Sequence, residues 1–150
     1  MTDAPESRPY TIVVGVDGSP NGQAAFEWAV VEARSRHGRL RAVEAWTAPY
    51  DWQLQPMFPV DVDQVRDAAR HRLDRALAAA DTQDVDVHSE LLEGEPGAVL
   101  VEAARDADLL VVGARGHSPL VQVLMGSVST YCAHHAPCPV VIVPTERHGS

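Results

Sequence analysis

The chain has 150 residues, with 12 Lys or Arg against 21 Asp or Glu, so its formal net charge at pH 7 is −9 with neutral histidines. All 12 basic residues are arginines. The absence of lysine excludes a P-loop NTPase, which needs the Walker A lysine, and Schiff-base catalysis on a lysine amine. The negative charge disfavours nonspecific nucleic-acid binding. The sequence has one local basic stretch, formed by Arg34, Arg36, Arg39 and Arg41. A solvated helix end explains this stretch as well as nucleic-acid binding does.

The length suits a single domain, expected over residues 10–144 between flexible ends 1–9 and 145–150. Hydrophobic residues make up 45% of the chain, which is enough for a core. No segment approaches the roughly 20 apolar residues of a membrane span. The polar N-terminus does not resemble a secretory signal, and two cysteines do not form a disulfide framework. We therefore expect a cytoplasmic protein.

The first strand and helix follow from an apolar run and a capping signal. Residues 10–16 lack polar alternation, which predicts a strand buried on both faces. Ser19 is expected to cap a helix whose first position is Pro20. The helix should run to about His37 and stop at Gly38.

The remaining elements alternate between strand and helix patterns. The third strand, with alternating polarity, is expected at an edge of the sheet, and the fourth, the most apolar, at its centre. This order predicts an α/β, Rossmann-like, doubly wound sheet of five parallel strands with helices on both faces. From the second strand onward, the predicted elements span residues 40–46, 62–80, 85–91, 96–105, 109–112, 127–135 and 139–143.

The segment Thr47–Asp61 departs from this pattern because three prolines interrupt it. Such a long loop is either functional or a surface connection whose aromatic side chains pack on the domain. Trp46 precedes this loop and Trp52 lies within it. We expect both side chains to pack on the domain and not to stack on a nucleotide base. Trp28 lies beside the apolar stripe of the first helix and is expected to pack as well.

In doubly wound sheets, ligands bind beyond the carboxyl ends of the strands where the winding direction reverses. Two segments occupy such positions here, Asp17-Gly18-Ser19 and Gly113–Gly116. Asp17 is interpreted either as a Mg²⁺ or ribose partner or as a turn residue beside Ser19, and the first interpretation is favoured.

A glycine pattern provides a second reason to expect a ligand at this edge. Gly113 and Gly116 allow a tight turn with exposed backbone N–H groups, which bind anionic oxygen. Gly126 and Ser127 begin the last helix, whose N-terminus forms a second anion site, and Ser129 adds a hydroxyl. These elements can hold successive phosphates without lysine.

Two other clusters are set aside. The spacing of Cys132, His134, His135 and Cys138 is not that of a standard zinc site. The serines lack the Gly-x-Ser-x-Gly turn of a serine hydrolase.

The chain resembles the universal stress protein family over roughly residues 10–144. The resemblance is carried by the opening Ile12–Ser19, the turn Gly94-Glu95-Pro96, the pattern G-x2-G-x9-G-S at Gly113, Gly116, Gly126 and Ser127, and the close Cys138–Pro144.

This resemblance implies a stress-response protein that binds ATP with Mg²⁺. By position, Asp17 lies near the ribose and phosphates, with a metal ion between them, and the backbone of Ala45 contacts adenine. Val112 and Gly113 line the base and ribose. The residues expected around the phosphates are Arg115, Gly116, Gly126, Ser127 and Val128.

The resemblance also implies a homodimer. The last strand, with Val140, Val141, Ile142 and Val143, is expected to pair with its copy. Such pairing covers an apolar edge strand, which is otherwise an aggregation hazard.

We expect a nucleotide-dependent regulatory module. Binding is favoured over catalysis because only Asp17 offers a general base and no lysine can stabilise a leaving phosphate. The alternatives are a slow ATP hydrolase or phosphotransferase, a binder of a cyclic or other adenine nucleotide, and, on fold alone, a flavin protein.

Overall fold

A computed structural model describes residues 8–48, 61–115 and 125–144. All five of its strands are parallel and form one sheet in the order β3-β2-β1-β4-β5. The strands are β1 (Thr11–Gly15), β2 (Arg39–Trp46), β3 (Asp86–Glu93), β4 (Leu109–Gly113) and β5 (Val140–Val143). The helices are α1 (Pro20–Arg36), α2 (Val62–Ala78), α3 (Pro96–Ala103), followed by a 3-10 turn (Ala104–Asp106), and α4 (Ser127–His135). The predicted Rossmann-like α/β fold is confirmed.

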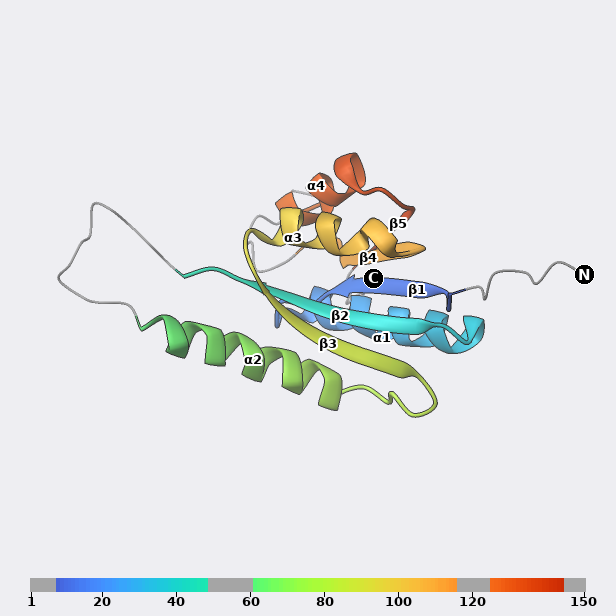
Figure 1. Ribbon diagram of the computed structural model, residues 1–150, viewed down its shortest axis with the longest axis horizontal. Helices are drawn as coiled ribbons and strands as arrows, with labels where there is room; N and C mark the ends of the chain where they lie inside the picture. Colours follow the sequence, from blue (N-terminus) through green and yellow to red (C-terminus); the bar gives the residue numbers. More distant parts are fainter. Residues whose placement is uncertain (1–7, 49–60, 116–124, 145–150) are drawn as a thin grey trace, which may run out of the picture.

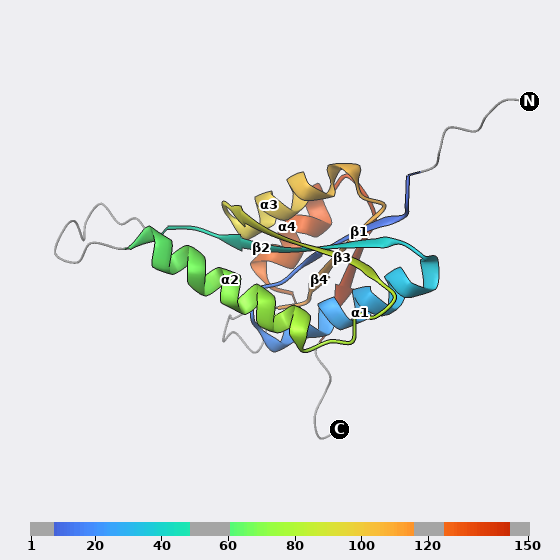
Figure 2. The same ribbon diagram turned by 60° about the horizontal axis from the view of Figure 1, so that its bottom comes forward.

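The helices cover both faces of the sheet (Figure 1). Helices α1 and α2 lie on one face, and α3 and α4 lie on the other, as the second view also shows (Figure 2). Each face has its own buried apolar cluster. Ile12 and Val14 of β1 join the cluster beneath α1 and α2, whereas Val13 joins the cluster with α3 and α4. This alternation gives a strand buried on both faces, as the apolar run 10–16 predicts.

The ends of α1 follow from local chemistry. The Ser19 hydroxyl accepts a hydrogen bond from the Gly22 N–H at 3.0 Å, and Pro20 occupies the first helical position. At the other end, the left-handed residue is His37, with φ 53°, and not Gly38. Gly38 is needed for a different reason, because a Cβ there would stand 2.5 Å from the Tyr10 carbonyl oxygen.

The prediction that Trp28 packs is wrong. The buried face of α1 is made largely of small residues, among them Ala25, Ala29 and Ala33, which let the helix lie close to the sheet. Trp28 lies outside this face and is 38% exposed, and Val31 beside it is 61% exposed.

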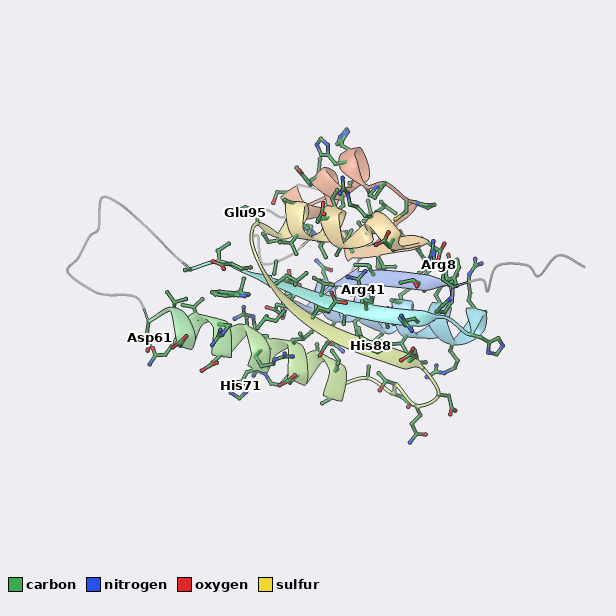
Figure 3. All side chains as sticks on the ribbon, in the orientation of Figure 1. Arg8, Arg41, Asp61, His71, His88 and Glu95 are labelled. Carbon is green, nitrogen blue, oxygen red and sulfur yellow. The ribbon has the colours of Figure 1, made fainter. Side chains whose placement is uncertain are left out.

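The edge position of β3 is confirmed, and charged pairs join it to β2. Arg39 bonds to Asp86 at 3.2 Å, and Arg41 to both carboxylate oxygens of Glu90 at 2.5 and 2.8 Å. Arg41, labelled in Figure 3, also donates to the carbonyl oxygen of Ala103 in α3. The basic stretch of the sequence is thus divided between the end of α1 and β2.

Some expectations fall on residues that the structure does not describe. Of the loop 47–61 it describes only residues 47, 48 and 61, and Gly116 of the glycine pattern also lies outside the described residues. Most of both chain ends also lies outside the described residues. Within the described ranges, none of the helices has the length and apolar character to cross a bilayer.

Candidate functional site

The winding of the sheet reverses between β1 and β4, which are neighbours at its centre. From β1 the chain continues into α1, on one face, and the helix that follows β4 in the order of elements, α4, lies on the other face (Figure 1). The chain therefore leaves the carboxyl ends of these two paired strands toward opposite faces of the sheet, as expected for a ligand site in a doubly wound sheet. A cleft lies there, with about 780 Å³ of free space that is partly open to solvent.

The cleft brings together eight of the nine residues singled out from the sequence, although they come from four different parts of the chain. Gly116 lies outside the described residues. Their shared position is a structural finding, and their contact with a ligand stays a prediction. The eight are Asp17, Ala45, Val112, Gly113, Arg115, Gly126, Ser127 and Val128.

The apolar wall of the cleft includes residues that sequence reasoning missed. Val43 lies beside β1, in register with Gly15, and both line the cleft. Pro96 and Leu100 stand one helical turn apart on α3 and close the same side. Strand alternation offered a signal for Val43, because it lies two residues before Ala45 and so faces the same side. The packing of α3 against the sheet left no comparable signal in the sequence.

Asp17 closes a turn and also lines the cleft. Its Oδ1 accepts hydrogen bonds from the backbone N–H of Ser19 at 2.9 Å and from the Ser19 hydroxyl at 2.5 Å. Gly18 between them has φ +80°, which glycine adopts without strain. The turn role, weighed as the less favoured interpretation, is therefore present in the structure. A ligand role for the same carboxylate is a separate proposal.

The N-terminus of α4 faces the cleft without a side-chain cap. Gly126 is the N-cap residue and supplies no side-chain hydrogen bond. The first helical hydrogen bond runs from the Thr130 N–H to the Gly126 carbonyl at 3.0 Å. The N–H groups of residues 127–129 thus precede the helical ladder and lie at the positive end of the helix dipole. This geometry suits an anionic oxygen.

The Ser129 hydroxyl is not available to an anion, as the sequence had suggested it would be. It is 1% exposed, and its hydroxyl lies within donating distance of the carbonyl oxygens of Ala114, at 2.8 Å, and Gly126, at 3.0 Å. The Gly126 N–H also donates to the Ala114 carbonyl at 2.6 Å. Ser129 therefore joins the beginning of α4 to the end of β4, and its hydroxyl is used within the protein.

Gly113 also has a different role from the tight turn expected of it. It is the last residue of β4 and does not have a positive φ. A Cβ at this position would stand 2.8 Å from the backbone carbonyl atoms of Asn21 in α1. The glycine thus permits the close approach of the α1 N-terminus to β4. The anion-binding turn with Gly116 stays a prediction.

The charged groups at the cleft are few. Among the described residues that line it, Asp17 is the only carboxylate and Arg115 the only cation. Mg²⁺ is usually held by one or two carboxylates together with phosphate oxygens, so one carboxylate fits a metal ion only if a phosphate-bearing ligand supplies the other oxygens. Throughout residues 8–48, 61–115 and 125–144, no three His, Cys, Asp or Glu side chains gather closely enough to hold a metal ion by themselves.

The cysteines lie away from this chemistry. Cys132 is fully buried in the cluster beneath α3 and α4, and burial raises the pKa of its thiol to about 11. Burial also raises the pKa of Cys138. Since a thiolate is the reactive and metal-binding form, this burial disfavours the reactive form of both thiols.

Comparison with known proteins shows that the chain is similar to one protein family over most of its length. The model of the "Universal stress protein family" matches residues 10–144. Universal stress protein Rv2623 of Mycobacterium tuberculosis is 36% identical over 141 residues, which cover 90% of this chain and 48% of the relative. The chain thus spans about half the length of such curated relatives.

Solved structures show the same likeness over nearly the whole chain. The universal stress protein UspA from Lactobacillus plantarum is 28% identical, with a TM-score of 0.69, over 92% of this chain and 99% of that one. A universal stress protein crystallised in complex with cAMP is 32% identical, with a TM-score of 0.59, over 93% of this chain and 100% of that one.

Proposed function

Because the chain belongs to the universal stress protein family, we propose that its cleft binds an adenine nucleotide and that it acts as a nucleotide-dependent regulatory module in the response to stress or growth arrest. The observation that carries the proposal is the uncapped N-terminus of α4 beside an apolar wall. An apolar slot with a few convergent polar groups is the usual design of a small-molecule site.

The two parts of the cleft match the two parts of a nucleotide. Val43, Ala45 and Val112 offer apolar surface and strand-end backbone to a base. The N–H groups at the beginning of α4 offer hydrogen bonds and a positive dipole to a phosphate. Arg115 adds the one side-chain cation among the described residues of the cleft. This division supports a nucleotide over a nucleoside or a purely apolar ligand.

We favour ATP with Mg²⁺ as the ligand. The glycine pattern G-x2-G-x9-G-S offers a second anion site besides the α4 N-terminus, and a polyphosphate needs more than one. Asp17 is suitably placed for a metal ion that the phosphates carry. Asp17 would help to hold the Mg²⁺ ion, which would neutralise negative charge on the phosphates.

A cyclic or monophosphate adenine nucleotide is the second candidate. A relative with 32% identity was crystallised with cAMP. The α4 N-terminus alone is sufficient for one phosphate group. The two candidates differ in their need for Mg²⁺ and for Asp17.

Isothermal titration calorimetry decides between these ligands. ATP with Mg²⁺, ATP with EDTA, AMP, cAMP and adenosine are titrated into the folded protein, and mass spectrometry identifies any nucleotide that copurifies. Tight binding of ATP that weakens in EDTA supports the first candidate, and Mg²⁺-independent binding of cAMP or AMP supports the second. If the folded protein binds none of the five, the proposed function is wrong.

We also propose that β5 pairs with its copy to form a homodimer. Strand β5 is the last strand of the sheet, and each of its residues, Val140–Val143, is only partly buried in the single chain. An unprotected apolar edge invites association, and pairing with a second copy covers it. Sedimentation equilibrium measures the mass and tests this proposal.

A further inference from the structure

The turn that carries Asp17 rests on a side chain of α2, the helix that shares one face of the sheet with α1. Gly18 lies against Arg72 of α2: a Cβ at Gly18 would stand 2.8 Å from the Cδ of Arg72 and 3.4 Å from its Cγ. The aliphatic part of Arg72 therefore supports the turn at its glycine. The residue before this glycine, Asp17, lines the cleft.

Arg72 is itself held in place by a buried acid. Its Nε donates to Oε2 of Glu44 in β2 at 2.8 Å, and the side chain of Glu44 is only 2% exposed. A buried carboxylate is stable only with close partners, so the geometry of this pair is well defined. The Glu44–Arg72 ion pair thus fixes the position of the arginine methylene groups beneath Gly18.

Glu44 lies between two residues of the cleft wall. Val43 and Ala45 line the cleft, and Glu44 points to the opposite face of β2, toward α2. The same short segment of β2 therefore contributes to the base-binding wall and, through Arg72, to the support of the Asp17 turn. Val16 connects the two strands further, because its N–H donates to the Val43 carbonyl at 2.9 Å.

We propose that Arg72, anchored by Glu44, is a positioning residue that holds the Asp17-Gly18-Ser19 turn in the geometry required for nucleotide binding. The inference rests on the proposed function, since it assigns Asp17 to the ligand. Arg72 does not line the cleft. Arg72 affects the affinity for the nucleotide indirectly, by contacting Gly18. Removal of the Arg72 side chain would let Asp17 and the Ser19 N–H move relative to each other.

The test separates positioning from stability. Arg72→Ala removes both the support and the partner of Glu44, and this variant is expected to lose stability. The double variant E44Q/R72A removes the buried charge, so it recovers stability but not the support of the turn. Arg72→Lys keeps the methylene groups and a cation and should rescue binding.

The matched control is the other Arg–Glu pair of β2. Arg41 bonds to Glu90 on the face of β2 opposite to Glu44, and neither residue of this pair lines the cleft. Arg41→Ala and R41A/E90Q therefore remove a comparable ion pair without affecting Gly18. All variants are measured well below their melting temperatures.

Two readouts are needed. The first is the affinity for ATP with Mg²⁺ and for cAMP, measured by calorimetry. We expect about tenfold weaker binding in R72A and in E44Q/R72A, which is equivalent to about 1.4 kcal/mol. Binding should be unchanged in both Arg41 variants. The second is hydrogen exchange of the Ser19 and Gly22 amides in the nucleotide-free protein, which should become faster only in the Arg72→Ala variants.

The inference is overturned if E44Q/R72A binds like the wild type with unchanged exchange at Ser19, or if the Arg41 variants lose as much affinity. If the wild type itself binds no nucleotide, the proposed function fails. The exchange of the Ser19 amide then still shows whether Arg72 supports the turn.

Discussion

Gly22, in the first turn of α1, lies so close to Asp17 that a Cβ on Gly22 would stand 2.5 Å from the Asp17 Oδ1. The same Oδ1 accepts both hydrogen bonds from Ser19. The absence of one methyl group thus allows the carboxylate to close its turn beside the helix N-terminus. Sequence reasoning assigned no role to this glycine.

Gly22→Ala is expected to destabilise the protein, although alanine normally favours a helix. The gain in helix propensity is about 1 kcal/mol. The displacement of the Asp17 carboxylate costs about 1–3 kcal/mol, as overpacking in a filled site does. We expect a net decrease in the free energy of unfolding, measured in urea, together with weaker binding of ATP with Mg²⁺. Ser35→Ala on the exposed side of α1 is the control, and equal behaviour of the two variants would contradict the prediction.

Ser127→Pro tests the backbone donors of α4. Proline is well accepted at the first helical position, and Gly126 already has the extended backbone that precedes a proline, with φ −80° and ψ 175°. The substitution removes one N–H from the proposed phosphate site. We expect about tenfold weaker binding of AMP or ATP, as for the loss of about 1.4 kcal/mol, and unchanged binding of adenosine.

Ser127→Ala separates the backbone from the hydroxyl in this experiment. If the alanine variant loses as much affinity as the proline variant, the hydroxyl and not the N–H group binds the phosphate. Circular dichroism and the melting temperature show that both variants keep the fold.

The Arg41–Glu90 pair predicts a stability loss in acid. The hydrogen bond from Arg41 lowers the pKa of Glu90 below its ordinary value of 4.5. Because the folded-state pKa is lower than the unfolded one, the stabilisation is complete above pH 4.5 and disappears as the pH falls through the folded value. Asp108 acts in the same direction, since the hydrogen bond from the Thr11 N–H lowers its pKa.

Glu90→Gln should therefore destabilise the protein most at neutral pH, by about 1 kcal/mol for a partly exposed pair. The difference from the wild type should shrink as the pH falls below 4.5. Urea unfolding from neutral to acidic pH measures both quantities. Asp74→Asn, which removes an exposed pair with Arg70 away from the N-terminus of α2, is the control with little expected effect at any pH. If the difference in the free energy of unfolding between the wild type and Glu90→Gln grows in acid, the predicted direction of the pH dependence is wrong.

Ile142→Pro tests the proposed pairing of β5. The carbonyl of Pro139 accepts a hydrogen bond from the N–H of Leu110 in β4, and that of Val143 accepts one from Ala114, the residue after β4. Since backbone groups alternate along a strand, those of Ile142 point to the open edge. A proline there removes an outward N–H without breaking the ladder to β4. We expect sedimentation equilibrium to give a monomer for this variant and a dimer for the wild type.

Val141→Pro is the matched comparison, because the backbone of Val141 points toward β4. This variant should lose stability within the single chain. If Ile142→Pro stays a dimer while folded, the proposed interface is wrong.

The sequence alone was enough for the fold and for most of the cleft. Alternating apolar strands and helical stripes have strong periodic signals, and the capping residues Ser19 and Pro20 mark where α1 begins. Parallel strands place their carboxyl ends at one edge, so Asp17 and Gly113 could be assigned to a common site from the order of elements. Ala45 and Val112 were added to that site by the resemblance to the universal stress protein family.

Only the tertiary structure decided which groups at that edge are used within the protein. The hydroxyl of Ser129 bonds to neighbouring carbonyls, and Gly113 makes room for the backbone of Asn21. Arg72 and Glu44 support the Asp17 turn from the face of the sheet that α1 and α2 cover. Periodicity reports which face a residue occupies, whereas these contacts depend on how closely one element approaches another. That distance is set by the packing of the whole domain, and a linear pattern does not contain it.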